Sequence, residues 1–142
     1  MIQASTSKTH SPLLAEALAL FLATQIAVQV QAIGVTFLTD NLTLAKAAAS
    51  PTLSDAQVPW ELRQQIAEYK KASELNSKIY HIKRNLNGVA HDCAQQAIRQ
   101  TQSLPIFSCS NSAHNMLGNC PIASSLQNFF SQEIVLHAVN CL

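Results

Sequence analysis

Charged residues are scarce in this chain. Asp, Glu, Lys and Arg make up 12% of its 142 residues, about half the share of an ordinary globular protein. Because 48% of the residues are apolar, the composition excludes a disordered chain and predicts one domain with a buried core, or a fragment of a larger fold. The net charge of +1 also excludes a molecule that binds polyanions through its overall charge.

The chain also lacks the close cysteine pairs of common zinc sites. Its four cysteines are Cys93, Cys109, Cys120 and Cys141, and no Cys-x-x-Cys motif occurs. Cys109, His114 and Cys120 lie near one another in the sequence, but their spacing matches no common zinc motif. We therefore expect free thiols in a reducing compartment.

One long apolar run, residues 14–33, is interrupted by Glu16 and by three glutamines. A charge is unfavourable in the apolar part of a signal peptide or in a membrane span. The sequence therefore favours an intracellular protein of the nucleus or the cytoplasm, with no membrane partner.

The apolar pattern predicts helices and strands in alternation. Residues 1–12 show no apolar period and are expected to be unstructured, and Ser11-Pro12 is a typical helix start. The predicted helices cover residues 13–33, 42–49, 60–74, 89–99 and 122–130, and the predicted strands cover residues 35–40 and 78–83. Residues 101–119 are expected to form a loop, and Ile134-Val135-Leu136 fits either a helix or a strand.

Asp40-Asn41 follows the first predicted strand. A carboxylate at the carboxyl end of a strand in an α/β fold points into the crevice where ligands bind. Alternatively, these two residues begin a turn or cap the next helix. Two strands separated by helices are joined by a right-handed crossover and pair in parallel. Because two parallel strands alone leave both edges open, we expect the complete fold to contain more strands.

Basic residues gather in one segment of an otherwise nearly neutral chain. Residues 70–84 contain Lys70, Lys71, Lys78, Lys83 and Arg84 and a single acidic residue, a local net charge of +4. Such a segment suits a phosphate backbone. The alternative, which the segment by itself favours, is an ordinary solvated helix end.

Four short motifs, in this order, resemble the ribonuclease H type 1 fold, and most closely the plant reverse-transcriptase-like ribonuclease H domains. The motifs are Ala15–Leu20, Leu38–Asn41, Trp60–Arg63 and His81–His91. The resemblance implies an α/β fold with a partial sheet of two parallel strands and flanking helices, in which the family's first three strands are missing before Ser11. It also implies a disordered N-terminus at 1–12, a truncated ribonuclease H-like domain at 13–100 and a C-terminal extension at 101–142.

The resemblance implies a magnesium-dependent hydrolase. The family cleaves the RNA strand of RNA–DNA hybrids, with four carboxylates holding two Mg²⁺ ions. By their motifs, Glu16 matches the helix glutamate and Asp40 matches the aspartate that ends the fourth strand. His81 fits the position of a loop histidine that assists catalysis or product release in some members, and it equally fits a strand.

Two of the four carboxylates are absent by this comparison. One belongs to the strands missing before Ser11. The other falls on His91, a nitrogen ligand that suits Mg²⁺ poorly. Asp92 is adjacent, but one residue on a helix is a rotation of about 100°, so it is expected to face elsewhere.

The resemblance therefore implies a nucleic-acid-binding domain that holds Mg²⁺ weakly through Glu16 and Asp40. Its expected partner is an RNA–DNA hybrid or RNA, contacted by the basic segment and Asn87, with no small-molecule cofactor. Endonuclease activity is expected to be weakened or lost. The alternative is a non-catalytic interaction or scaffold remnant of a retroelement-derived gene.

Overall fold

The computed structural model describes residues 2–6, 9–52, 58–72, 77–100, 108–114, 117–126 and 134–141. The chain falls into two compact units. The first, Thr9–Asn87, is called the crossover unit below, and the second, Met1–Lys8 with Gly88–Leu142, is called the C-terminal unit. This division differs from the predicted domain at 13–100, because it assigns residues 88–100 to the C-terminal unit.

The crossover unit begins with helix α1, Pro12–Gln29. Its predicted start is confirmed: the Ser11 side chain accepts a hydrogen bond from the Leu14 amide at 3.4 Å, and proline occupies the first turn. The helix ends four residues before the predicted residue 33. The chain leaves it through Gln31 and Gly34, whose φ angles are 53° and 70°, and positive φ ends a helix.

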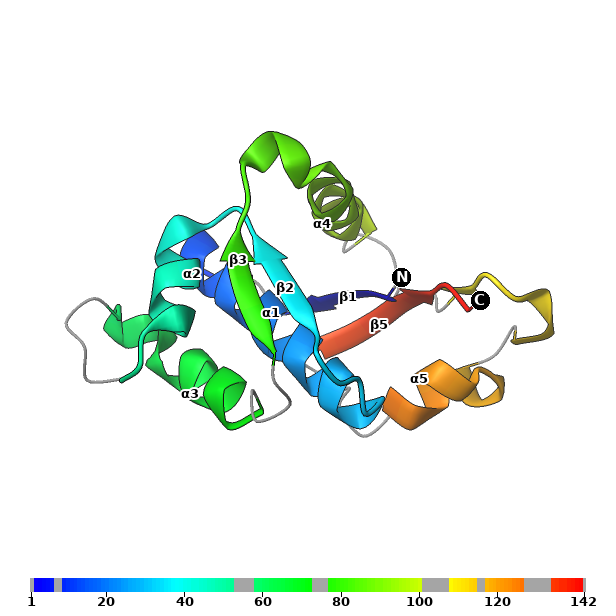
Figure 1. Ribbon diagram of the computed structural model, residues 1–142. Helices are drawn as coiled ribbons and strands as arrows, with labels where there is room; N and C mark the ends of the chain where they lie inside the picture. The colour runs from blue at the N-terminus through cyan, green and yellow to red at the C-terminus, as the bar shows by residue number, and fades with distance from the viewer. Residues whose placement is uncertain are drawn as a thin grey trace. The chain divides into compact units, whose positions relative to one another are not determined.

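Strands β2 (Thr36–Thr39) and β3 (Lys78–His81) pair in parallel, as predicted. Thr36 lies opposite Lys78, and Thr39 lies opposite His81. Figure 1 shows the two arrows side by side and pointing the same way, with α1 behind them. His81 is therefore the last residue of a strand, which decides between the two positions that the sequence left open for it.

Two helices connect these strands. Helix α2, Leu42–Ala49, has its predicted bounds and is capped by Asn41, whose Oδ1 accepts a hydrogen bond from the Leu44 amide at 3.1 Å. Helix α3, Arg63–Ala72, follows a 3₁₀ turn at Trp60–Leu62, so the predicted helix at 60–74 begins with a different geometry. Its predicted end lies outside the described residues.

The core of the crossover unit lies between the three helices and one face of the strand pair. Its buried residues are Ala17, Leu20, Leu44, Ala47, Ala48, Val58, Leu62, Ile66 and Tyr69. Phe37 and Ile79 pack against this core from the strands, and the Phe37 and Tyr69 rings meet edge to face at 5.9 Å. Leu38 and Tyr80 lie on the opposite face of the strands and are exposed. The helices therefore cover one face of the strand pair.

Helix α1 is long and apolar enough to cross a membrane, by its length and its mean hydropathy of 1.5 alone. Core helices of soluble proteins and signal sequences share these properties. In the crossover unit, Ala17 and Leu20 of α1 belong to the buried core. Apolar side chains on this part of the helix are therefore explained by packing.

The C-terminal unit contains a second sheet, with strand order β1-β5-β4. Strand β1, Ile2–Thr6, is antiparallel to β5, Ile134–Val139, and β4, Ser108–Cys109, is parallel to β5. The prediction that residues 1–12 are unstructured is therefore wrong for residues 2–6. The five residues of β1 are mostly small and polar, and their backbone partners lie more than a hundred residues away in the sequence, where no local pattern reveals them.

Two helices complete the described part of the C-terminal unit. Helix α4, Gly88–Gln100, exceeds its predicted bounds by one residue at each end, and α5 is Pro121–Leu126. The rest of the helix predicted at 122–130 lies outside the described residues. Short 3₁₀ turns and β4 occupy parts of the segment that was predicted to be a loop.

Candidate carboxylate site

Asp40 lies immediately after β2, and its side chain is only 18% exposed. Its Oδ1 accepts a hydrogen bond from Asn87 Nδ2 at 3.1 Å, and its Oδ2 lies 3.9 Å from Arg84 Nε. Both partners follow the end of β3. Because parallel strands bring their carboxyl ends to the same edge, the segment after β3 reaches the carboxylate that follows β2.

Glu16 is the second carboxylate of this site. It lies in the second turn of α1 rather than in the first, so it is not one of the first-turn acidic residues that the helix dipole favours. Burial raises the pKa of Glu16, the charge of Asp40 raises it further, and the Arg84 guanidinium lowers it. The two carboxylates therefore interact electrostatically. Glu16, Asp40, Arg84 and Asn87 are called the carboxylate site below.

Asp40 and Asn41 have different roles, so neither alternative describes both residues. Asn41 caps α2 through its side chain, and its own amide donates a hydrogen bond to Thr39 Oγ1 at 3.0 Å. Asp40 caps nothing and points its carboxylate to Arg84 and Asn87. The capping role of Asn41 therefore leaves Asp40 available for the site.

His81 stands at the same end of the strand pair. It is opposite Thr39 in the register, and the next amide, that of Ile82, donates a hydrogen bond to the Thr39 carbonyl at 2.9 Å. The His81 side chain is exposed. The structure thus places an exposed imidazole on β3, opposite Thr39, the residue that precedes Asp40.

His91 and Asp92 belong to α4 of the C-terminal unit, and both side chains are exposed. His91 Nε2 lies 2.9 Å from Gln95 Nε2. The four residues of the carboxylate site, in contrast, all belong to the crossover unit.

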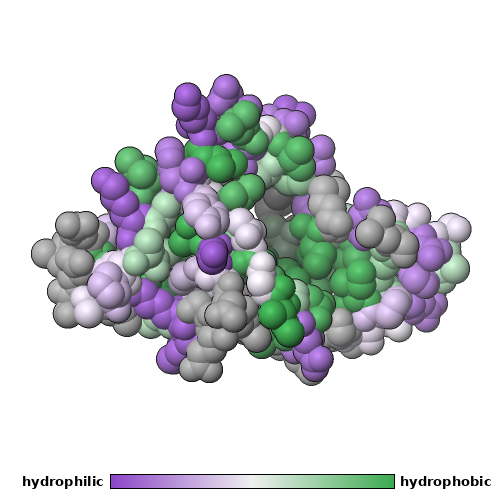
Figure 2. Space-filling model, in the orientation of Figure 1, coloured by the Kyte–Doolittle hydropathy of each residue, from purple (hydrophilic) through white to green (hydrophobic). Residues whose placement is uncertain are grey.

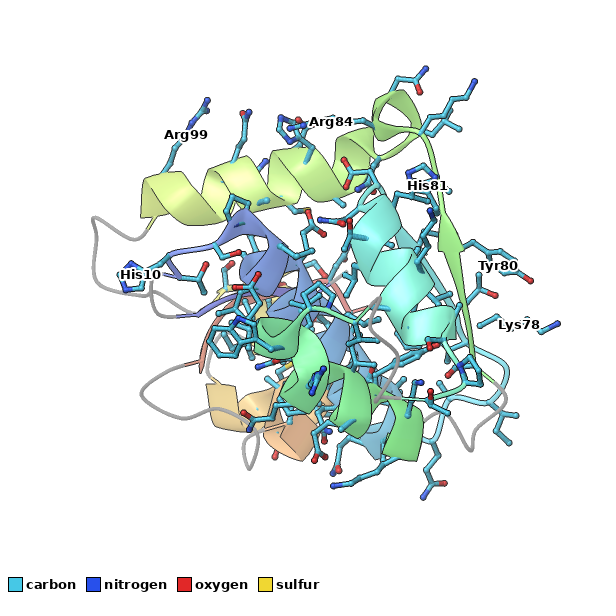
Figure 3. The ribbon with its side chains drawn as sticks, turned by 90° about the vertical axis from the view of Figure 1, so that its left-hand side faces the viewer. His10, Lys78, Tyr80, His81, Arg84 and Arg99 are labelled. Atoms are coloured by element: carbon cyan, nitrogen blue, oxygen red, sulfur yellow. The ribbon has the colours of Figure 1, made fainter. Side chains whose placement is uncertain are left out.

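The predicted basic segment is not one continuous surface. Lys83 and Arg84 are exposed just beyond β3, whereas Lys78 stands at the opposite end of that strand (Figure 3). Figure 2 shows hydrophilic and hydrophobic side chains mixed over the turn that follows β3, where Leu86 is also exposed. On α3, Lys71 pairs with Glu68 at 2.8 Å and Lys70 donates a hydrogen bond to the Ser50 carbonyl. Of the five predicted cations, Arg84 therefore belongs to the carboxylate site and Lys83 is adjacent to it in the sequence.

Replacing Glu16 by Gln is expected to stabilise the crossover unit at neutral pH. A carboxylate whose pKa is raised on folding favours the folded state while it is protonated, and that stability is lost as the pH rises through the folded pKa. The neutral amide removes this loss. In thermal unfolding, the melting temperature of Glu16→Gln should exceed that of the original chain at pH 7. The gap should shrink as the pH falls to about 4, where Glu16 becomes protonated in both states.

Sequence reasoning did not foresee the partners of Asp40. Arg84 and Asn87 lie 44 and 47 residues beyond Asp40 in the sequence, and only the parallel pairing of β2 with β3 brings them near it. A second group of ligand-type side chains, Cys109, His114, Cys120 and Cys141, was also missed. The spacing of the first three residues matched no zinc motif, and Cys141 lies too far from them in the sequence to be recognised as the fourth member.

A family model described as reverse transcriptase-like matches residues 1–97. The match starts before Ser11 and includes β1 and most of α4 as well as the whole crossover unit. Searches of curated proteins and of solved structures found no significant match.

Proposed function

Because the chain belongs to the reverse transcriptase-like family and carries a ribonuclease H-like domain, we propose that it binds an RNA–DNA hybrid or RNA at the carboxylate site. We further propose that it cleaves RNA far more slowly than a family member with four metal-binding carboxylates. The family implies nucleic acid as the partner and generally uses a divalent metal. The observation that carries the proposal is that Asp40 lies at the carboxyl end of the parallel strands and that its charge raises the pKa of Glu16.

The donors of the site fit one magnesium ion. Mg²⁺ prefers hard oxygen ligands, and proteins commonly hold it with one or two carboxylates together with substrate phosphates. The charge of Asp40 raises the pKa of Glu16, so an ion between the two carboxylates would relieve their repulsion. Glu16 and Asp40 would hold the ion. When bound, it would supply charge stabilisation at the phosphate and activation of water.

Arg84 and Asn87 orient Asp40 and offer contacts for the nucleic acid. Asn87 donates a hydrogen bond to one carboxylate oxygen of Asp40, and Arg84 forms an ion pair with the other. The Arg84 side chain is 80% exposed, so its remaining guanidinium donors are open to a phosphate, which Arg binds in a bidentate manner. The exposed His81 would hold a proton for the leaving oxygen at the same end of the strands.

Slow cleavage follows from the shortage of carboxylates. The sequence supplies Glu16 and Asp40, and its last motif places His91 where the family has an aspartate. A site that holds one ion lacks the second, which stabilises the other oxygen of the displacement in a two-metal mechanism.

The charge-reversed variant Lys83→Glu/Arg84→Glu is expected to bind a hybrid duplex more weakly and with a flatter salt dependence. Each lost phosphate contact should reduce the slope of log K against log salt by about 1. The measurement is fluorescence anisotropy with a labelled RNA–DNA duplex at several salt concentrations.

Lys46→Glu is the control for the Lys83→Glu/Arg84→Glu variant. Lys46 is an exposed lysine in the last turn of α2 and belongs to neither the carboxylate site nor the segment after β3. We expect its substitution to leave the salt slope nearly unchanged. Equal slopes for the Lys83→Glu/Arg84→Glu variant and the original chain would contradict this binding surface.

One observation favours the alternative, a non-catalytic nucleic-acid-binding scaffold. Asp40 is already paired with Arg84 and Asn87, so its carboxylate is satisfied without a cation. A scaffold would bind the hybrid with the same affinity whether Mg²⁺ or EDTA is present, and it would not cleave it. The proposed weak nuclease requires cleavage that depends on Mg²⁺.

A further inference from the structure

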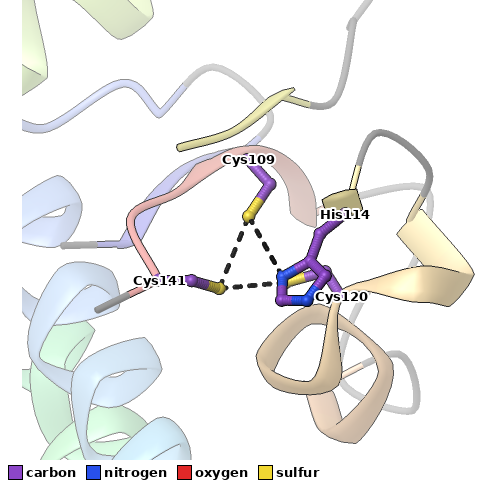
Figure 4. Close-up of side chains that lie close together, drawn as sticks. All are labelled: Cys109, His114, Cys120 and Cys141. Carbon is purple, nitrogen blue, oxygen red and sulfur yellow. Dashed lines mark hydrogen bonds between the residues drawn. The ribbon is translucent and has the colours of Figure 1, made fainter. Parts of the chain in front are cut away.

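Three thiols and one imidazole converge in the C-terminal unit (Figure 4). One sulfur or nitrogen atom from each of Cys109, His114, Cys120 and Cys141 lies within 4.8 Å of the corresponding atom of all the others. Cys120 is completely buried, and the other three are partly buried. The four cysteines of the chain, all within the described residues, form no disulfide.

Four separate elements supply these side chains. Cys109 ends β4, His114 ends a 3₁₀ turn, Cys120 precedes α5, and Cys141 follows β5. Parallel pairing sets Cys109 opposite Val139, two residues before Cys141. The segments therefore meet at the cluster because the sheet brings them there, although Cys109 and Cys141 are 32 residues apart.

We propose that Cys109, His114, Cys120 and Cys141 form a closed, tetrahedral Cys₃His site for a structural Zn²⁺ ion. The proposal is independent of the carboxylate site, because it concerns other residues, another unit and another metal. Thiolate and imidazole ligands suit zinc, whereas Mg²⁺ prefers oxygen.

The distances suit a shared ion better than a bond between sulfurs. Cys141 Sγ lies 3.4 Å from both Cys109 Sγ and Cys120 Sγ, and Cys109 Sγ lies 3.9 Å from His114 Nδ1. Zinc–sulfur bonds of about 2.3 Å in a tetrahedron separate two sulfurs by about 3.8 Å. A disulfide bond is only about 2.05 Å long. For the two sulfur–sulfur pairs, a central ion at bonding distance therefore requires a separation larger by only a few tenths of an ångström.

Hydrogen bonds already hold the segments around the cluster. The Ala123 amide donates to Cys120 Sγ at 3.5 Å, and Ser110 Oγ donates to the Cys141 carbonyl at 3.1 Å. Asn111 accepts a hydrogen bond from the His114 amide at its carbonyl and one from the Ala113 amide at its side chain. Hydrogen bonds that orient the ligands and support a thiolate are typical of metal sites.

The small core of this unit gives the ion a structural role. Among the described residues, the buried cluster at this place consists of Cys120, Ala123, Leu136 and Val139, and one of these is itself a proposed ligand. Small units with so few buried apolar side chains are commonly stabilised by a disulfide or a metal. We therefore expect zinc binding and the folding of this unit to be coupled.

The first test is the zinc content of the full chain, expressed with zinc and purified without chelators. Elemental analysis should find about one zinc ion per chain. Cys120→Ser and Cys141→Ser should each lose most of it. Cys93→Ser is the matched control: Cys93 lies on α4 outside the cluster, so this variant should keep its zinc.

The second test keeps the proposal falsifiable if the serine variants fail to fold. Cobalt added to the zinc-free original chain should give the visible bands of tetrahedral Co²⁺ and a thiolate charge-transfer band, and zinc should abolish both. His114→Cys preserves four ligands, so it should retain zinc and strengthen the charge-transfer band. A chain with no stoichiometric zinc and no tetrahedral cobalt spectrum would overturn the proposal. So would mass spectrometry showing a disulfide among these cysteines in the chain purified under reducing conditions.

Discussion

Asp40→Asn should lower any Mg²⁺-dependent cleavage of an RNA–DNA hybrid by about 10²–10³-fold, the usual cost of removing one interaction that stabilises charge in the transition state. The amide keeps the shape of the side chain and removes the negative charge that would hold the cation. Asp40 also positions Arg84 and Asn87, so both contacts weaken with the loss of charge. The measurement is single-turnover cleavage of a hybrid with a labelled RNA strand, for the original chain and the variant side by side.

Glu68→Gln is the matched control for this experiment. It removes one negative charge from α3, where Glu68 forms a surface ion pair with Lys71, and it should leave the cleavage rate unchanged. Manganese binding, followed by electron paramagnetic resonance, gives a readout that does not depend on turnover. It should fall in Asp40→Asn and stay the same in Glu68→Gln. Rapid turnover like that of a member with four carboxylates, or unaltered manganese binding in Asp40→Asn, would contradict the proposed site.

Leu62→Ala is expected to destabilise the crossover unit by about 2–5 kcal/mol, the usual range for removing a buried leucine side chain. Leu62 is completely buried in the core cluster, in the short turn that leads into α3. Because small domains are stable by only about 5–15 kcal/mol, a loss of this size brings the unit close to unfolding. Urea denaturation followed by circular dichroism measures the change.

Trp60→Ala, two residues away in the same turn, is the control for the Leu62 variant. Trp60 is the larger side chain, but it is 82% exposed. Its removal should change the free energy of unfolding by no more than about 0.5 kcal/mol, as for most surface substitutions. A larger cost for Trp60→Ala than for Leu62→Ala would show that Trp60 is buried in solution and that this part of the core is different.

The local signals of the sequence determined much of the crossover unit. Ser11 and Pro12 fixed the start of α1, and the end of α2 fell at the residue before Ser50-Pro51, as the sequence predicted. Two strands separated by helices implied a parallel pair, which the structure confirms. Caps, prolines and apolar periods act within a few residues, so they can be read directly from the sequence.

The tertiary structure alone decided which distant segments meet. Strand β1 exists because β5 pairs with it, and the Arg84 and Asn87 contacts to Asp40 exist because β3 ends beside β2. In the same way, the β4–β5 pairing brings Cys141 to Cys109 and completes a group of ligands that sequence spacing did not reveal. The sequence by itself predicted most of the helices and the parallel pair, and its resemblance to a known family supplied the two candidate carboxylates. Side-chain partners far apart in the chain depend on strand register and packing, which a local pattern of residues does not encode.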